Sequence, residues 1–295
     1  MRALESVLPG VVCPLITPFD GGAVDQAALR DHVAFLTDRG VDGLFPCGTT
    51  GEFASLDRAE WLAVVETTVD AAPGDVPVVA GAAATSVAET VERTALAGDA
   101  GADAAVVVPP YFHTANAAAG NRRFFEAVAD DAALPLLLYN IPACTGRGID
   151  VETVVAMADH DRVHGLKDSS GDLGYVLDVL GETPDDFLVL QGYDALLVPS
   201  LAMGADGGVS ALSNVCPETC AAAVAADPDT ARDLQIDVIG PLFRACVEHG
   251  FAPAAKAALC ERGVLDDDAV RPPLVGVPDA ERERLRELLA AADLV

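Results

Sequence analysis

The sequence predicts an α/β protein, a (β/α)8 barrel followed by a C-terminal helical extension. Short apolar runs alternate with alanine-rich helical stretches, eight of each over about 225 residues, which is the usual size of such a barrel. Apolar residues make up 51% of the chain but aromatic residues only 5%, so Ala, Val and Leu must fill the core. A doubly wound sheet is the main alternative, and the count of eight units favours the barrel.

The expected strands are short and mostly apolar rather than alternating. This pattern is typical of parallel strands that are covered on both faces. They are Val11–Leu15, Gly43–Phe45, Val76–Ala80, Ala104–Val108, Leu136–Tyr139, Val163–Lys167, Phe187–Gln191 and Gly207–Val209.

The expected helices carry start and stop signals. Asp57 and the pair Ser86 and Glu89 offer capping groups at helix starts, while Gly40 and Gly101 follow helix ends. The barrel helices are expected at Asp25–Arg39, Asp57–Ala71, Ser86–Ala100, Asn121–Asp131, Val151–Ala158, Leu173–Leu180, Ala195–Met203 and Pro217–Ala226.

The alternation stops after about Asp227. Thr230–Glu248, Ala252–Glu261 and Asp279–Ala292 have helical patterns with no strands between them. The sequence therefore predicts a barrel over residues 1–226 and a helical appendage, packed on the barrel, over residues 227–295.

The chain is strongly acidic, with 46 acidic residues against 18 basic ones and a formal charge of −28. Such a surface repels nucleic acid and anionic membranes. An acidic surface stays hydrated in concentrated salt, where its self-repulsion is screened, so we expect a halophilic protein whose folding depends on molar salt. We expect a cytoplasmic location, because no signal peptide or membrane-length apolar run is visible and the seven scattered cysteines are typical of reduced core residues.

Only two lysines occur in the chain, Lys167 and Lys256. Lys167 ends an apolar strand and precedes a Gly/Ser-rich turn. An amine there can be desolvated, which favours the neutral nucleophile and allows a Schiff base to a carbonyl substrate; an ordinary charge capping a strand is the alternative. Lys256 lies inside a C-terminal helix, where we expect a salt bridge or an interface contact.

The active site of such a barrel lies at the carboxyl ends of its strands. After the second strand, the turn at residues 48–52 offers two hydroxyls and free backbone N–H groups that suit a small carboxylate. Tyr139 ends the fifth strand and supplies a phenol for proton transfer. Taken singly, the turn could be a capped βα turn and Tyr139 a core residue. Their convergence with Lys167 predicts a carbonyl substrate with an adjacent carboxylate, a 2-oxo acid.

Four motifs occur in the order and spacing of a known family. They are Gly48-Thr49-Thr50-Gly51-Glu52, Tyr139-Asn140-Ile141-Pro142, Gly165-Leu166-Lys167-Asp168 and Gly204-Ala205-Asp206-Gly207. Nearly the whole chain resembles the dihydrodipicolinate synthase / N-acetylneuraminate lyase superfamily of pyruvate-dependent class I aldolases. Within that superfamily it most resembles a haloarchaeal 2-keto-3-deoxy(6-phospho)gluconate aldolase.

The resemblance implies roles for the matching residues. Lys167 would form the Schiff base, Tyr139 would transfer protons with the help of Thr49, and Thr50 would hold the carboxylate. Asp194 would bind substrate hydroxyls, although it could instead cap the following helix. The other implied substrate-binding residues are Gly48, Tyr111, Phe112, Gly192, Val209 and Arg147, the last toward a distal carboxylate or phosphate. No metal or organic cofactor is implied, and a homotetramer built as a dimer of dimers is, with Tyr111 and Phe112 near the tight interface.

One departure bears on the substrate. Dihydrodipicolinate synthases that resemble this chain carry an arginine for the second substrate's carboxylate where Cys144 stands here, and a thiol cannot make a bidentate contact. We therefore expect a carbon–carbon lyase that cleaves 2-keto-3-deoxygluconate or its 6-phosphate, as in an Entner–Doudoroff route, to pyruvate and glyceraldehyde or its phosphate. The alternative is a 4-hydroxy-tetrahydrodipicolinate synthase that condenses pyruvate with aspartate semialdehyde. A non-catalytic sensor and a metal-dependent aldolase are both disfavoured, the first by the intact motifs and the second by the absence of a histidine cluster at strand ends.

Overall fold

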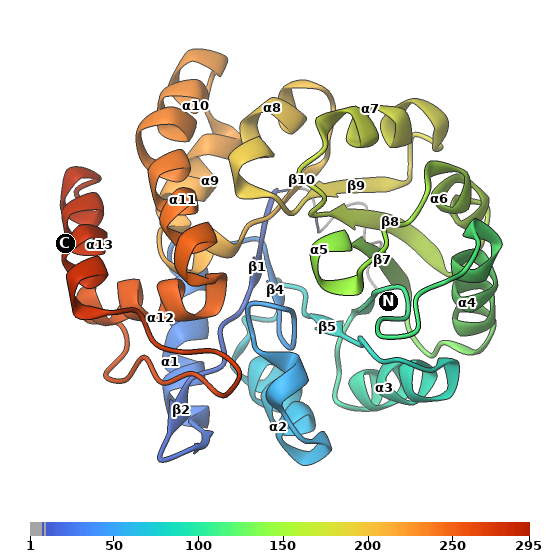
Figure 1. Cartoon of the computed structure of the whole chain (residues 1–295), viewed down its shortest axis with the longest axis horizontal. Helices are drawn as coiled ribbons and strands as arrows, with labels where there is room; N and C mark the ends of the chain where they lie inside the picture. The colour runs from blue at the N-terminus through green and yellow to red at the C-terminus, as the bar shows by residue number, and fades with distance from the viewer. Residues whose placement is uncertain (1–7, 9) are drawn as a thin grey trace.

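The computed structural model describes residue 8 and residues 10–295. Parallel strands form a barrel at the centre, and helices surround it (Figure 1). Within the described residues, the barrel strands are β1 (Gly10–Pro14), β4 (Gly43–Phe45), β5 (Val79–Gly81), β6 (Ala104–Val107), β7 (Leu136–Asn140), β8 (Val163–Asp168), β9 (Leu188–Gln191) and β10 (Gly207–Val209).

Strand pairing follows the order expected for a (β/α)8 barrel. The hydrogen-bonded order is β4-β1-β10-β9-β8-β7-β6-β5, with every ladder parallel. A parallel bridge between Leu44 and Val78 joins β4 to the segment that leads into β5 and so closes the ring. The predicted fold class is confirmed.

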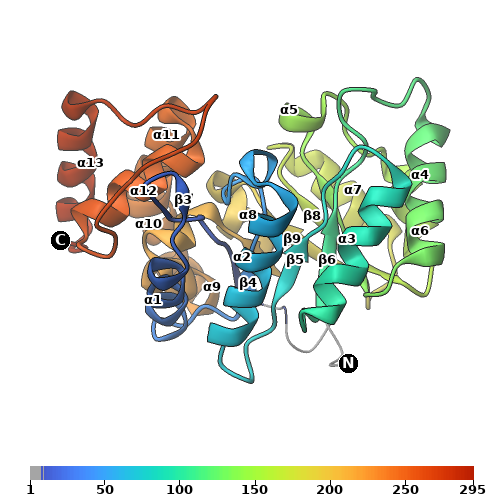
Figure 2. The same ribbon diagram turned by 90° about the horizontal axis from the view of Figure 1, so that it is seen from below.

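The helices between the strands lie on the outside of the ring (Figures 1 and 2). They bury small aliphatic side chains against the outer face of the strands, as the low aromatic content led us to expect. These outer helices are α1 (Gln26–Thr37), α2 (Arg58–Ala71), α3 (Val87–Asp99), α4 (Ala118–Asp131), α6 (Val151–Ala158), α7 (Leu173–Glu182), α8 (Leu197–Ala202) and α9 (Pro217–Ala225). The one-turn helix α5 (Pro142–Thr145) instead lies over the centre of the barrel in Figure 1.

The C-terminal helices gather on the side of the barrel where α1 lies (Figure 2). A hydrophobic cluster joins Val11 of β1 to Phe243, Leu259 and Leu289 of three C-terminal helices, so this region packs on the barrel wall. The elements are α10 (Pro228–Leu234), a π-helical turn (Gln235–Ile239), α11 (Gly240–His249), α12 (Phe251–Glu261) and α13 (Asp279–Ala291).

Several local features differ from the sequence-based expectation. A short hairpin, β2 (Phe19–Asp20) with β3 (Ala23–Val24), and the one-turn helix α5 were not expected. The third barrel strand begins at Val79 rather than at Val76, and Pro77 contributes only its carbonyl, to Leu44 N at 2.9 Å. Proline has no N–H to donate to a ladder, which explains the later start.

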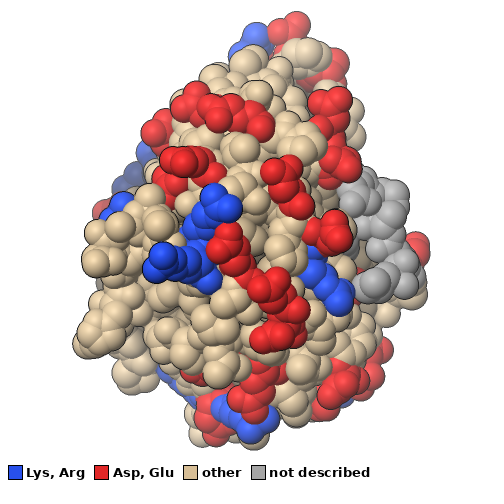
Figure 3. Space-filling view, turned by 90° about the vertical axis from the view of Figure 1, so that its right-hand side faces the viewer, with Lys and Arg blue, Asp and Glu red and all other residues tan. Residues whose placement is uncertain are grey.

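Acidic side chains spread over the molecular face shown in Figure 3, and basic ones form only a few small groups there. None of the helices in the described part of the chain combines the length and apolarity needed to cross a membrane.

Candidate active site

Two of the three predicted catalytic side chains lie on neighbouring strands at the same level. Tyr139 of β7 and Lys167 of β8 are register partners in the parallel ladder. The Lys167 Nζ lies 3.9 Å from the centroid of the Tyr139 ring and 4.9 Å from that of Phe45. Lys167 is 4% exposed, so aromatic faces rather than water surround much of its amine.

Asn140 and Asp168, the residues directly after Tyr139 and Lys167, join the two strands by a side-chain hydrogen bond. Asn140 donates from Nδ2 to Asp168 Oδ1 at 2.7 Å and accepts from the backbone N–H of Ile149 at 2.9 Å. The second oxygen of Asp168 accepts from the N–H and hydroxyl of Ser170. Burial raises the pKa of Asp168, and its hydrogen bonds from Asn140 and Ser170 oppose that rise. This network fixes the register that brings Tyr139 and Lys167 face to face.

The turn after β4 forms the third part of the site. Its backbone is closed by hydrogen bonds from Gly51 N to Gly48 O and from Glu52 N to Thr49 O, each 3.1 Å long. Thr17 donates to the Gly51 carbonyl at 2.7 Å. Thr50 is 6% exposed, whereas Thr49 stands at the surface of the cavity. Such a turn presents hydroxyls and backbone amides to a small anion.

The absence of a side chain at Gly192 leaves space for the side chain of Lys167. A Cβ placed at Gly192 would come 2.7 Å from Lys167 Cε and 2.3 Å from Ser169 Oγ. That hydroxyl is buried and has no hydrogen-bond partner among the described residues. Because Ser169 lines the cavity around Lys167, this hydroxyl is a candidate hydrogen-bonding group for a ligand.

These elements enclose a catalytic cavity of about 250 Å³ at the carboxyl ends of the strands. An adjoining cavity of about 270 Å³ shares Thr49, Ile141 and Cys144 with it. The catalytic cavity is lined by Pro14, Thr49, Thr50, Tyr139, Ile141, Ala143, Cys144, Lys167, Ser169, Gly192, Tyr193, Val209, Ala211 and Phe251. The adjoining cavity is lined by Thr49, Glu52, Phe53, Ala54, Ser55, Val108, Tyr111, Ile141, Cys144, Thr145, Pro273 and Leu274.

The structure brings most of the predicted site residues together. Six of them line the catalytic cavity: Lys167, Tyr139, Thr49, Thr50, Gly192 and Val209. Tyr111 lines the adjoining cavity, and burial raises the pKa of its phenol. Gly48 lies next to the Phe45 ring, 3.1 Å from where its Cβ would be. The absence of a side chain thus allows the turn to pack closely against Phe45.

Three predicted residues lie elsewhere. The Asp194 carboxylate points into the protein, where Oδ1 accepts from the Ser210 hydroxyl and from Leu212 N, so the structure does not place it among substrate hydroxyls. Arg147 donates to the Ala115 carbonyl at 3.1 Å on the surface. Phe112 is 90% exposed with a φ of 70°. The sequence around these residues does not specify which way their side chains point, because that direction depends on the fold.

Several residues that line the catalytic cavity were not among the predicted site residues, and Ser169 and Phe251 are two of them. Ser169 directly follows the strand that carries Lys167, so the rule about strand ends could have found it. Phe251 comes from α12 in the C-terminal region, and no local sequence signal connects it with the site.

Cys144 lines both cavities. Burial raises the pKa of its thiol, and the charge of Lys167 partly opposes that rise.

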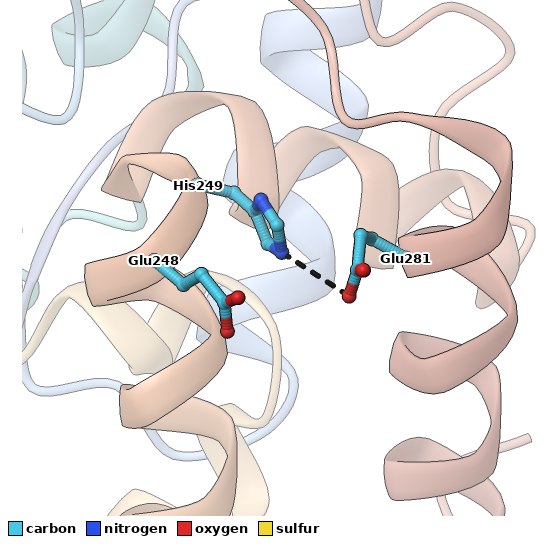
Figure 4. Close-up of side chains that lie close together, drawn as sticks. All are labelled: Glu248, His249 and Glu281. Carbon is cyan, nitrogen blue, oxygen red and sulfur yellow. Dashed lines mark ion pairs between the residues drawn. The ribbon is translucent and has the colours of Figure 1, made fainter.

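One group of side chains away from the cavity has metal-binding character. Glu248 and His249 at the end of α11 face Glu281 at the start of α13, with ligand atoms within 4.8 Å of one another (Figure 4). His249 Nε2 lies 3.5 Å from Glu281 Oε2. None of these residues lines either cavity. The contact joins two C-terminal helices and stands apart from the catalytic residues.

Comparison with known proteins places this geometry in a family. A model of the dihydrodipicolinate synthetase family matches residues 7–292. The chain belongs to that family. A 4-hydroxy-tetrahydrodipicolinate synthase from Natronomonas pharaonis is 41% identical over 288 residues, which cover 95% of this chain and 96% of the relative. A second, from Thermomicrobium roseum, is 40% identical and the match covers 97% of this chain and 95% of the relative.

Solved structures of the family have the same fold. The dihydrodipicolinate synthase of Aquifex aeolicus superposes with a TM-score of 0.92 at 32% identity, covering 97% of this chain and 99% of that one. A prophage protein of the family from E. coli K12, solved in complex with pyruvate, gives 0.93 at 30% identity, covering 98% and 100%.

Family membership establishes the class of chemistry. Enzymes of this family are lyases of the class I aldolase type that use a lysine Schiff base with pyruvate and no metal or organic cofactor. The predicted superfamily is confirmed. The relatives named above are synthases and not sugar-acid aldolases, so their names support the alternative substrate more than the preferred one.

Proposed function

We propose that Lys167 is the Schiff-base lysine and that Tyr139 and Thr49 move protons beside it. In the cleavage direction, the Lys167 amine attacks C2 of a 2-oxo acid and water leaves, which forms an iminium. Tyr139 takes the proton of the C4 hydroxyl, the C3–C4 bond breaks, and the C4 fragment leaves as the aldehyde. The electron pair of the broken bond moves into the iminium and gives an enamine. Protonation at C3 and hydrolysis then release pyruvate. The 3.9 Å approach of Lys167 Nζ to the Tyr139 ring supports these roles.

We further propose that the substrate is 2-keto-3-deoxygluconate, cleaved to pyruvate and glyceraldehyde. The observation that carries this proposal is the chemistry of the cavity walls. Among the described residues that line the two cavities, Lys167 has the only cationic side chain. The Ser169 hydroxyl has no partner among the described residues and lies, like Lys167 Cε, beside the Cβ position of Gly192. Hydroxyl groups suit a neutral polyol chain, which needs no charge partner.

The same argument favours the unphosphorylated sugar acid over its 6-phosphate. A phosphate carries up to two charges and is usually bound by Arg, Lys or a cluster of backbone amides. Arg147 is the residue we expected to meet it, but its guanidinium lies on the surface against the Ala115 carbonyl. Cys144, at the position of the synthases' arginine, offers no charge either.

The second candidate is a 4-hydroxy-tetrahydrodipicolinate synthase. The observation in its favour is the identity of 41% with a synthase of that name over nearly the whole chain. Its second substrate, aspartate semialdehyde, carries a carboxylate. That carboxylate would need a partner other than Cys144.

Parallel assays decide between the candidates. Pyruvate release from 2-keto-3-deoxygluconate and from its 6-phosphate would be compared, in molar KCl, with condensation of pyruvate and aspartate semialdehyde. We expect the unphosphorylated sugar acid to give the highest kcat/KM. Faster condensation with aspartate semialdehyde would establish the second candidate instead.

A variant at one position sharpens the comparison. Cys144→Arg should raise kcat/KM for aspartate semialdehyde and lower it for the sugar acid, since the guanidinium supplies a carboxylate partner. Cys144→Ser keeps the volume without the charge and serves as the matched control, with both activities close to the parent. An arginine variant that changes neither activity would show that this position does not select the substrate.

A further inference from the structure

We propose that Lys256 is a positioning residue for the reaction, acting through Glu52 to hold the Thr49–Thr50 turn in the shape that receives the substrate carboxylate. The inference rests on the proposed function, because it takes the ligand to be a 2-oxo acid whose carboxylate the turn binds, as the sequence led us to expect. It would make the C-terminal region part of the active-site architecture and not only a cover for the barrel wall.

The first observation is an ion pair in the interior. Lys256 Nζ donates to Glu52 Oε1 at 2.6 Å and to the Ala269 carbonyl at 2.7 Å, and both charged side chains are 0% exposed. The ammonium also lies 4.2 Å from the centroid of the Phe19 ring. Burial lowers the pKa of Lys256, and the Glu52 carboxylate opposes that effect. Charges this deep in a protein are normally tolerated only with a partner and full hydrogen bonding.

The second observation is that both oxygens of Glu52 are held by the C-terminal region. Oε1 accepts from Lys256 on α12, and Oε2 accepts from the backbone N–H of Arg271 at 2.9 Å. These partners lie 204 and 219 residues further along the chain. The carboxylate therefore has little freedom to shift unless the C-terminal region moves with it.

The third observation is the backbone of Glu52 itself. It has a φ of 53°, in the left-handed region that residues other than glycine rarely adopt. Its N–H bonds to the Thr49 carbonyl, and its carbonyl accepts from Ser55 N at 2.8 Å. A conformation of this kind persists only where the surroundings impose it, and the side-chain contacts of Glu52 are suited to do so.

The same C-terminal elements contribute walls to both cavities. Phe251, in the helix that carries Lys256, lines the catalytic cavity. Leu274, close to Arg271, lines the adjoining one. Loss of the ion pair would thus release the carboxylate turn and the walls of the cavities together.

The test is the concentration of pyruvate that half-saturates borohydride trapping on the enzyme, followed by mass spectrometry in molar KCl. This readout does not depend on which aldehyde is the second substrate. We expect Lys256→Met to raise the half-saturating concentration by about tenfold to 100-fold, because small misplacements of binding groups have effects of that order. At saturating pyruvate the variant should still form the adduct on Lys167.

Arg262→Met is the matched control. Arg262 is also a buried cation of the C-terminal region, 9% exposed in its side chain and paired with Glu218 at 2.7 Å, but it does not touch the turn. This variant should lose thermal stability and keep the parent's half-saturation. An equal rise in both variants would mean general loosening and would overturn the proposal.

Two further variants keep the test decisive if Lys256→Met does not fold. Glu52→Gln preserves the shape of the side chain, and the pair Glu52→Gln with Lys256→Met buries no unpaired charge. Either should show the weakened saturation. Parent-like saturation in a folded variant would overturn the role of Lys256, whereas a parent enzyme that traps no pyruvate would overturn the proposed function itself.

Discussion

At the scale of single residues, the site depends on small side chains around a buried amine. Lys167 can lie between the Tyr139 and Phe45 rings because Gly192 leaves its path clear. Burial against these two rings keeps water away from the amine, which suits the Schiff-base role that we propose for Lys167. Asn140 and Asp168 then hold the strands in the register that this arrangement needs.

Gly192→Ala should therefore reduce activity strongly. Its Cβ would lie 2.7 Å from Lys167 Cε and 2.3 Å from Ser169 Oγ, distances that force both side chains to move. We expect kcat/KM for pyruvate release to fall by about 100-fold or more, as for other displacements of about 1 Å in catalytic groups. Gly181→Ala in α7 is the control, because nothing lies within 4 Å of its Cβ position. Parent-like kinetics in Gly192→Ala would show that the lysine does not need this space.

At the scale of secondary-structure elements, the site residues come mainly from the segments that follow the barrel strands, and the longer helices form the outer layer. The turn after β4 and the one-turn helix α5 bring Thr49, Thr50 and Cys144 to the cavity. The segment around Arg271 in the C-terminal region holds the turn after β4, because the Arg271 backbone N–H donates to Glu52 in that turn. Arg271 donates to the Ser55 carbonyl and to both oxygens of Glu60 at the start of α2.

The ion pair between Arg271 and Glu60 predicts a pH-dependent contribution to the stability of the folded state. Hydrogen bonds from Arg271 hold the pKa of Glu60 at about 2, below its ordinary value of 4.5. A carboxylate whose pKa is lower in the folded state stabilises it fully above the unfolded-state value, and the contribution is lost as pH falls from there through about 2. Glu60→Gln should therefore have a lower Tm than the parent at pH 6, and the difference should shrink steadily below pH 4.5.

Thermal unfolding of both proteins at one fixed KCl concentration checks this. Glu92→Gln, which removes an exposed pair with Arg58, should change Tm little at any pH. A difference between the parent and Glu60→Gln that does not vary between pH 6 and 3 would contradict the assignment.

Much of this architecture could be predicted from the sequence. The eight apolar runs and the glycines after helices are local signals, and each barrel strand lies within a few residues of its predicted position. Strand-end logic found Lys167, Tyr139 and the turn that holds Thr49. It could not find Phe251, which comes from the C-terminal region, or the Glu52–Lys256 pair, whose partners lie 204 residues apart. The direction of the Asp194 side chain likewise depends on Ser210 and Leu212, which no pattern around Asp194 specifies.

At the scale of the whole molecule, charge is the dominant feature. With 46 acidic and 18 basic residues, the folded state repels itself in dilute buffer. The Debye length is about 3 Å at 1 M salt and about 10 Å at 0.1 M, so molar salt removes most of this repulsion.

We expect Tm to rise markedly between 0.1 M and 2 M KCl. Circular dichroism at increasing KCl measures this directly. Sodium chloride at matched ionic strength should act similarly if screening is the cause. A Tm that is independent of salt across this range would contradict the halophilic interpretation.

The homotetramer that the resemblance implies is also a matter of the whole molecule. The exposed, positive-φ Phe112 and its neighbour Tyr111 are suited to a subunit contact, as the homotetramer implied by the resemblance would require. We propose that these residues lie in the tight interface of that assembly.

The most direct test of the central claim is to identify the lysine that captures pyruvate. The protein would be incubated with pyruvate and borohydride in molar KCl, digested, and mapped by mass spectrometry, with Lys167→Met as the comparison. We predict one reduced pyruvate adduct, on Lys167, and none on the variant, which should retain the circular dichroism spectrum of the parent. An adduct on Lys256, or an unchanged yield in the Lys167→Met protein, would contradict the account.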